Sequence, residues 1–380
     1  MKLIFVLLIL SFNIWAYPQF ISKGYTNCLT CHYNPYGNGP LTDYGRAVSA
    51  SALADRLFVP KSITDDDLGN ASGFLFSTPK NKWFRPAYDY RGLQLDRAIS
   101  DEENKDSKYI TMQNDATVTL QFGKRNNIII TGTYTYLPAQ DEDDEDDEAE
   151  TFSPEHYIGY RPMKELGIYV GKMDKVFGIR VPDHISYSKT LNNLGLRSQS
   201  HGVLLHWNDK DYEVGVQVFD GDKEKKEEEQ SSGITSKFEY NLTKNVRVGA
   251  SYMRETLSNE DIQDVKAALL KARIGEASST MVEIGQNDKE LNSGGERSSR
   301  YAFWQSHLYL KRGMYFLMTF EYLKSDLNED AHRYRVSPGF QYFPWQRLEV
   351  RFDLQNNKSY GETLNTQDRW DLLGQVHLWF

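Results

Sequence analysis

Residues 109–122, YITMQNDATVTLQF, alternate apolar and polar side chains with a period of two. One face carries Ile110, Met112, Asn114, Ala116, Val118, Leu120 and Phe122, and the other carries Tyr109, Thr111, Gln113, Asp115, Thr117, Thr119 and Gln121. This period is that of a β-strand, and the pattern is typical of a transmembrane strand with lipid on one face and a polar lumen on the other. A strand of a soluble sandwich alternates similarly, so the connections between strands must decide.

Fifteen further segments have strand character. They lie near 87–95, 127–137, 154–162, 166–173, 201–208, 211–219, 233–242, 245–255, 265–275, 278–286, 300–310, 314–323, 332–343, 347–356 and 368–380. Long and short connections alternate between them, which is the rule for outer-membrane barrels. We therefore predict an all-β fold, a transmembrane antiparallel β-barrel of about 16 strands, within a range of roughly 14 to 18.

Two segments bear on this prediction. Residues 262–275 could form a helix on propensity alone, but the loop alternation requires a strand there. The chain ends at Phe380, and Leu378, Val376, Gly374, Leu372 and Trp370 share its face. A terminal aromatic residue after alternating apolar residues resembles the assembly signal of bacterial outer-membrane barrels.

Composition narrows the class of protein. The net charge is −9, which argues against nucleic acid as a partner. Mean hydropathy is −0.61, which is too polar for a helical membrane protein. The chain is rich in aromatic residues, with 24 tyrosines, 19 phenylalanines and 7 tryptophans. Residues 1–16, with Lys2 before an apolar run and Ala16 at the end, indicate a secretory signal peptide. No later apolar run reaches 18 residues, so no helical anchor is expected.

Residues 17–70 form a separate segment that contains C-x-x-C-H at Cys28, Cys31 and His32. This is the attachment signature of c-type haem, in which two thiols bind the porphyrin edge and the histidine ligates iron. The chain has no other cysteine. The alternative is a redox or disulfide C-x-x-C with an incidental histidine. A zinc site would need further ligands nearby, and the next histidine is His156.

The residues after the motif add a resemblance. The motif is followed by a turn-rich loop and a short predicted helix over 41–57, capped by Thr42 or Asp43. The matching positions are Asn34-Pro35, Gly37, Gly39, Leu41-Thr42 and Tyr44-Gly45-Arg46. Together they resemble the N-terminal haem segment of bacterial porin-like outer-membrane barrel proteins that carry one C-x-x-C-H motif. The resemblance implies one haem c on Cys28, Cys31 and His32, and electron transfer. Residues 71–84 are then a linker and 85–380 the barrel.

Two charged stretches lie in predicted external loops. Residues 141–148 are continuously acidic, which suits divalent-cation binding, electrostatic recruitment of a basic partner or a solvated loop tip, and the solvated tip is favoured. The longest loop, 172–200, carries Lys175, Arg180, Lys189 and Arg197. Folded into the lumen, it would form a pore constriction that presents cations to anionic solutes. Folded outward, it would be only a long loop.

The leading hypothesis is an outer-membrane barrel with one covalent haem facing the periplasm and a role in electron transfer. Its partners would be outer-membrane lipid and periplasmic electron carriers or another cytochrome, because one haem cannot bridge an apolar band about 25 Å tall. The alternative is a diffusion porin for small polar solutes in which the haem segment is a plug. A haem enzyme or ligand sensor ranks third. Trimers are common among such pores, so a homo-oligomer is one expectation.

Overall fold

The computed structural model describes residues 16–17, 20–21, 25, 27–37, 39–78, 81–101, 105–139, 148–183, 185–361 and 367–380. The predicted signal peptide, apart from Ala16, and the acidic run, apart from Glu148, lie outside these residues. Within these ranges, no helix has both the length and the apolar character needed to cross a bilayer.

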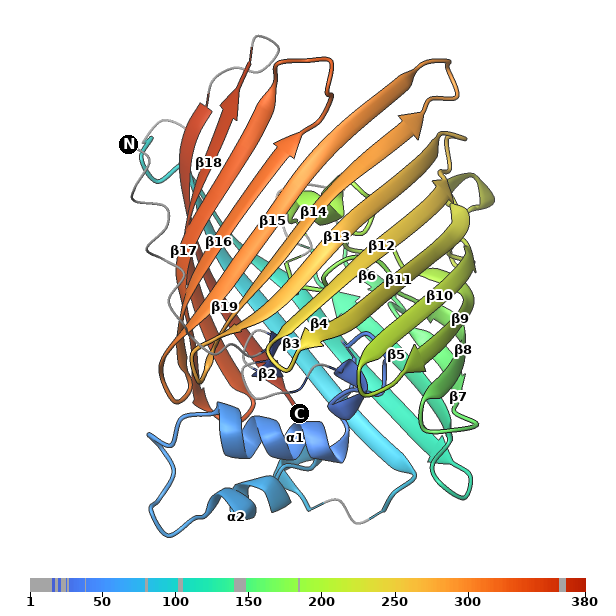
Figure 1. The fold of residues 1–380 in the computed structure, drawn as a ribbon. Coiled ribbons are helices and arrows are strands. Elements are labelled where there is room, and N and C mark those ends of the chain that lie inside the picture. Colours follow the sequence, from blue (N-terminus) through green and yellow to red (C-terminus); the bar gives the residue numbers. More distant parts are fainter. Residues whose placement is uncertain are drawn as a thin grey trace.

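The described strands close into one antiparallel barrel, which confirms the predicted fold (Figure 1). The strands are β3 (Phe84–Arg97), β4 (Asp106–Phe122), β5 (Ile128–Leu137), β6 (Glu150–Phe152), β7 (His156–Tyr160), β8 (Leu166–Met173), β9 (Ser200–Asn208), β10 (Tyr212–Asp220), β11 (Ser232–Thr243), β12 (Val246–Thr256), β13 (Ile262–Ile274), β14 (Ser278–Glu290), β15 (Glu296–Lys311), β16 (Met314–Lys324), β17 (His332–Trp345), β18 (Leu348–Tyr360) and β19 (Gln367–Trp379). β6 and β7 both pair with β5 and share one position, so the barrel has sixteen positions. β19 pairs with β3 and closes it.

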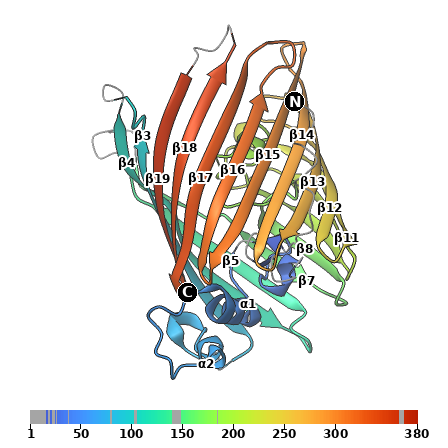
Figure 2. The same ribbon diagram turned by 60° about the vertical axis from the view of Figure 1, so that its left-hand side comes forward.

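The two ends of the barrel differ in their connections. At one end, tight turns such as Arg312–Gly313 and Gln346–Arg347 join neighbouring strands. At the other end lie the longer loops, including residues 174–199 between β8 and β9. We call the first the short-turn end and the second the long-loop end. The C-terminus and the helices of the N-terminal segment lie at the short-turn end (Figures 1 and 2).

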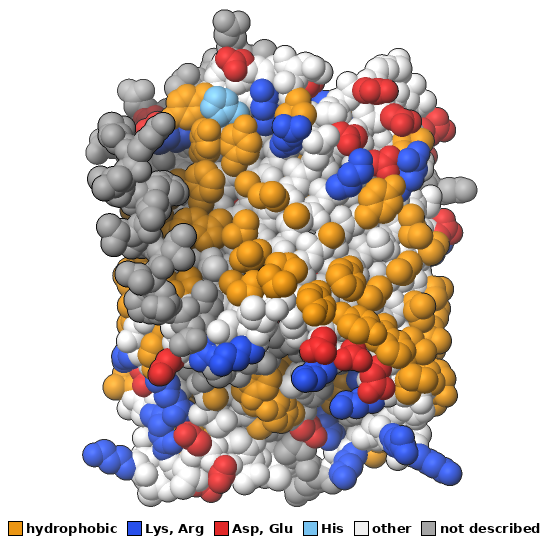
Figure 3. Space-filling view, viewed as in Figure 1, with side chains coloured by type: hydrophobic (Ala, Val, Ile, Leu, Met, Phe, Trp, Pro, Cys, Tyr) orange, Lys and Arg blue, Asp and Glu red, His pale blue; other side chains and the backbone are white. Residues whose placement is uncertain are grey.

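Side chains on the barrel wall are distributed between its two faces as a lipid environment requires. In β10, Glu213 and Gln217 are buried on the inner face, whereas Val216 and Val218 point outward and are 37% and 57% exposed. Figure 3 shows apolar side chains along the outer face of the strands. Apolar residues outside and hydrogen-bonded polar residues inside are the inverse of a soluble protein.

One detail of the predicted alternation is wrong. β4 carries a β-bulge at Met112, opposite Arg91 and Gly92, so the inner and outer faces exchange at that point. Met112, predicted to face lipid, lines the lumen. Tyr109, predicted to face the lumen, is 54% exposed and its hydroxyl bonds that of Tyr90 at 2.5 Å. A bulge depends on the partner strand, so the period of one strand does not reveal it.

The N-terminal segment consists of short elements. They are β1 (Ala16–Tyr17), β2 (Phe20–Ile21), η1 (Cys28–Thr30), α1 (Asp43–Val48), the π-helical turn η2 (Ser49–Leu53), α2 (Asp65–Asn70) and η3 (Phe74–Phe76). α1 and η2 together form the predicted helix, and the Thr42 hydroxyl caps it by accepting a hydrogen bond from the Gly45 N–H at 3.1 Å. α2 lies in the part of the segment for which no helix was predicted, and Thr64 and Asp67 form its capping box.

Candidate functional site

The N-terminal segment fills the mouth of the barrel at the short-turn end. Arg312, in the β15–β16 turn, donates hydrogen bonds to the carbonyls of Ser51 and Ala54 at 2.6 and 2.7 Å, where the helix ends. A guanidinium at this position satisfies carbonyls that have no partner within the helix. Leu53 packs inside the mouth with Tyr315, Leu317 and Phe343. The helix is therefore docked to the wall by both polar and apolar contacts.

Further contacts fix the opposite side of the segment to the wall. Asp43 and Arg85 form a bidentate ion pair at 2.6 Å. Asn34 donates a hydrogen bond to the Glu155 carboxylate at 2.9 Å, and this carboxylate is buried. Arg161 donates to the carbonyl of Tyr33 at 3.0 Å. Arg85 lies in β3, Glu155 between β6 and β7, and Arg161 directly after β7, so separate parts of the wall hold the segment as a plug across the mouth.

A single helical turn places both thiols on the plug. The N–H groups of Cys31 and His32 donate to the Cys28 carbonyl at 3.0 and 2.8 Å. The side chain of Asn27 caps this turn by accepting from the Leu29 N–H at 2.8 Å. Neither cysteine is in a disulfide. Burial raises the pKa of both thiols, that of Cys31 to about 11, so both are protonated at neutral pH.

Two glycines allow the close packing around this turn. A Cβ on Gly45 would lie 2.3 Å from the Cys31 carbonyl oxygen, so α1 packs directly on the backbone of the motif. Gly37 has φ +81°, a conformation that favours glycine, and its Cβ position lies 3.5 Å from Cys28 Sγ and 4.0 Å from His32 Cδ2. A side chain at position 37 would lie beside the thiol and the imidazole, so the glycine leaves that space open.

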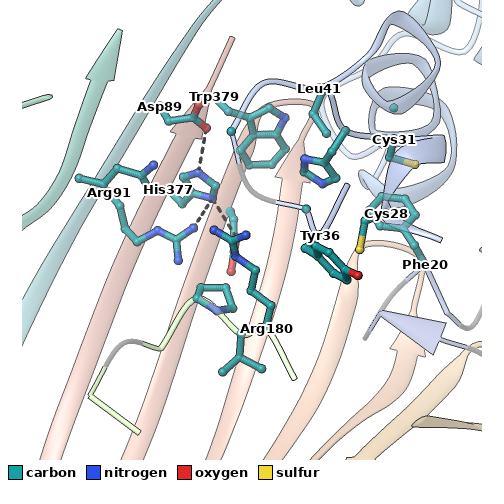
Figure 4. Close-up of a pocket in the computed structure, with 18 of the residues that line it drawn as sticks. Phe20, Cys28, Cys31, Tyr36, Leu41, Asp89, Arg91, Arg180, His377 and Trp379 are labelled. Atoms are coloured by element: carbon teal, nitrogen blue, oxygen red, sulfur yellow. Dashed lines mark hydrogen bonds and ion pairs between the residues drawn. The ribbon is translucent and has the colours of Figure 1, made fainter. Parts of the chain in front are cut away.

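Cys28, Cys31 and His32 line one cavity of about 410 Å³, which extends along the lumen from Phe380 to the loop residue Leu196. This volume is within the range of about 300–1,000 Å³ typical of ligand sites. Figure 4 shows the two cysteines on one side of the cavity and Arg91 and His377 on the other. Among the described residues that line the cavity, eight are Lys or Arg (Arg46, Arg91, Arg180, Lys189, Lys237, Lys271, Arg347 and Arg351) and five are carboxylates (Asp89, Asp115, Asp174, Glu213 and Glu349).

Part of the cavity wall is a buried ionic network next to the plug. Glu239 accepts from Lys237, Lys271 and Arg247 at 2.9, 2.6 and 2.5 Å. Arg247 also bonds Glu213 at 2.7 Å. Three cations face two carboxylates, so the network carries a net positive charge beside the plug. Lys237 and Lys271 were not among the predicted site residues, although both stand at inward positions of predicted strands.

The loop 174–199 folds into the lumen rather than outward. Its residues Phe177, Ile179, Val181 and Tyr187 pack on inner apolar side chains, including Met253 and Phe303. Four of its backbone N–H groups donate to wall side chains: Val176 to Gln217 at 2.8 Å, Gly178 to Ser251 at 3.1 Å, Ile179 to Glu283 at 2.5 Å and Tyr187 to Glu321 at 2.7 Å. The loop also contains the short helix α3 (Tyr187–Thr190).

The four loop cations occupy different environments. Arg180 and Lys189 line the cavity. Arg180 pairs with Asp174, and Lys189 donates to the Val181 carbonyl at 2.6 Å. Lys175 is buried in an ion pair with Glu255 at 2.5 Å, and Arg197 pairs with Glu150 away from the cavity lining. The sequence spacing alone does not distinguish these environments.

No protein-family model matches the chain, and no curated protein matches it. Solved structures share its fold. An OmpT variant of Vibrio cholerae that lacks loop L8 aligns with a TM-score of 0.61 at 8% identity, covering 78% of this chain and 99% of that one. An anion-selective porin from Comamonas acidovorans gives 0.58 at 8% identity, covering 78% and 99%. The channel DcaP of Acinetobacter baumannii gives 0.58 at 10%, covering 78% and 97%. The chain therefore has the porin-like outer-membrane barrel fold.

Proposed function

We propose that this chain is an outer-membrane channel for small anionic solutes, with the plug at the periplasmic mouth. The observation that supports this proposal is the inward position of the loop 174–199. The loop narrows the lumen and presents Arg180 and Lys189 to the cavity. Charged side chains at a constriction set the selectivity of a pore. The apolar outer face supports placement in lipid. Anion selectivity is also the property named for the Comamonas acidovorans porin.

Reversal potentials in planar bilayers test this proposal. Under a potassium chloride gradient, the purified chain should give a reversal potential shifted toward the equilibrium potential of chloride. The double variant Arg180→Gln, Lys189→Gln should lose most of that preference, because two cavity cations are removed. Arg197→Gln is the matched control, since it removes a cation of the same loop that does not line the cavity. Equal effects of both variants, or no channels at all, would contradict the proposal.

A second candidate function rests on the C-x-x-C-H turn. Two thiols without a disulfide and one imidazole line the same cavity, and this donor set fits a covalent haem c. Cys28 and Cys31 would form the thioether bonds and His32 would ligate iron. The haem would supply a one-electron Fe(III)/Fe(II) couple. Because the apolar band is about 25 Å tall, the electron would be exchanged with a periplasmic carrier or a further cytochrome.

Optical spectra of the detergent-solubilised protein test the second function. We expect a c-type spectrum and a positive pyridine haemochrome assay after expression with haem-attachment machinery. Cys28→Ala combined with Cys31→Ala should abolish both signals without loss of the folded barrel. Absence of haem from the native chain would refute this function and leave the channel proposal intact. Conductance recorded with and without haem would then show whether the two functions are coupled.

A further inference from the structure

The turn at residues 73–77, which contains η3, exposes two large apolar side chains at the short-turn end. Leu75 is 63% exposed and Phe76 is 38% exposed. Both have positive φ, 52° and 62°, a left-handed conformation that bulky residues adopt rarely. Two consecutive residues of this kind hold apolar side chains in the open rather than under the plug.

The 73–77 turn is fixed against the rim of the barrel. The Phe76 ring stacks on Trp345, with centroids 5.2 Å apart and 24° between the planes, and meets Phe380 edge-on at 5.9 Å. The Arg347 guanidinium lies 4.5 Å from the centroid of the Phe76 ring and donates a hydrogen bond to the Gly73 carbonyl at 2.5 Å. The turn therefore has a defined position relative to the barrel wall.

That position continues the lipid-facing surface of the barrel. Trp345 pairs in register with Leu348, which pairs with Leu378 of β19. The same outward row of β18 includes Phe352, which is 55% exposed. Tryptophan is enriched where the apolar band of a membrane barrel meets the headgroups. Trp345 marks that level, Phe76 stacks on it, and Leu75 is the preceding residue of the turn.

We propose that the 73–77 turn is a lipid anchor, which inserts Leu75 and Phe76 between the headgroups of the leaflet at the short-turn end. The ligand is the phospholipid surface itself. An aromatic and an aliphatic side chain supply the apolar contact, and Arg347 sits on the inner side of the turn. The anchor fixes the plug to the membrane as well as to the barrel. It goes beyond channel function and rests only on the barrel lying in a bilayer.

Quenching by brominated acyl chains tests the anchor in the full chain. A single cysteine from Leu75→Cys, in a chain with Cys28→Ser and Cys31→Ser, is labelled with bimane and reconstituted into liposomes. Brominated lipid should lower its fluorescence about twofold or more, as it should for Phe352→Cys on the barrel face. Lys61→Cys, exposed on the plug, should be unaffected. Quenching at 352 but not at 75 overturns the anchor alone. No quenching at either position overturns the anchor and the membrane placement together.

A second measurement keeps the native cysteines. Leu75→Asp places a charge in the headgroup boundary, so trypsin should release the plug of the reconstituted protein several-fold faster at 1 M salt. Leu57→Asp is the matched control, because Leu57 is a leucine of the same segment with 64% exposure. Equal release rates for the two variants would overturn the proposal. A faster rate for Leu75→Asp alone supports it.

Discussion

At the scale of single residues, packing explains the positions around the C-x-x-C-H turn independently of the proposed haem. Thr42 caps α1, Asn34 binds Glu155 of the wall, and Gly45 lets α1 touch the Cys31 backbone. Arg46 donates to the carbonyl of Pro86 at 2.6 Å. The positions that resemble the haem segment of porin-like barrel proteins are therefore also positions that dock the plug and present its two thiols to the lumen.

Gly45→Ala should loosen the plug around the motif. The added Cβ would lie 2.3 Å from the Cys31 carbonyl oxygen, which is backbone and cannot rotate away. Overpacking of this kind costs about 1–3 kcal/mol. We expect the thiols of the haem-free variant to be alkylated several-fold faster at pH 8 than those of the native chain. Gly132→Ala is the control, since a Cβ there has no heavy atom within 4 Å. Unchanged alkylation in Gly45→Ala would contradict the packing argument.

Lys189 should make the selectivity of the channel depend on pH. Burial, and then the nearby Arg180, lower the pKa of Lys189 from 10.5 to about 8. A lowered lysine pKa means that the positive charge is present below pH 8 and is lost as pH rises through 8. Chloride preference should therefore fall between about pH 7 and pH 9. Lys189→Arg should keep its preference over this range, because arginine stays charged. A native profile flat to pH 9.5 would exclude this role.

At the scale of elements, the loop 174–199 is held by a few wall side chains that accept from its backbone. Because these acceptors are buried, removing one leaves an N–H group without a partner, which costs about 1–3 kcal/mol. Glu283 is the strongest test case, since it accepts from the Ile179 N–H at 2.5 Å and from the Tyr301 hydroxyl at 2.8 Å.

Glu283→Ala should release the middle of this loop from the wall. We expect larger and noisier single-channel conductance, because the loop would no longer be fixed across the lumen. Glu276→Ala, an exposed carboxylate in the β13–β14 turn, is the control. A conductance identical to that of the native chain would mean that the remaining loop contacts suffice.

The sequence predicts the strands well because lipid imposes a rule on every one of them. All sixteen predicted segments correspond to barrel positions, and β13 is a strand despite its helix propensity. The bulge at Met112 and the break between β6 and β7 escape prediction because they depend on distant partners. Glu155, at that break, bonds Asn34 of the plug, 121 residues away in sequence. The environments of Lys175 and Arg180 differ for the same reason, since pairing with Glu255 or Asp174 follows from the fold of the loop.

At the scale of the whole molecule, barrel and plug are built on different principles. Barrel closure needs only β19 pairing with β3, and no described residue before Phe84 contributes a strand to it. The plug is attached by ion pairs, hydrogen bonds and two apolar clusters, one around Leu53 and one in which Tyr36 packs with Tyr157, Tyr169 and Leu204. We therefore expect the wall to form without the plug, whereas the plug buries Tyr36 and Leu53 against barrel residues and so depends on the wall.

Deletion of residues 20–78 should leave a folded barrel with a wider passage. The variant should keep the heat-dependent shift in gel mobility that a closed barrel gives, because every strand pair of the barrel is retained. Its single-channel conductance should rise by roughly twofold or more, since a sixteen-strand barrel without a plug leaves an aqueous channel. The loop 174–199 remains in this variant, so chloride preference should persist while conductance increases. A conductance equal to that of the full chain would show that ions already bypass the plug, and the constriction would then be the loop alone.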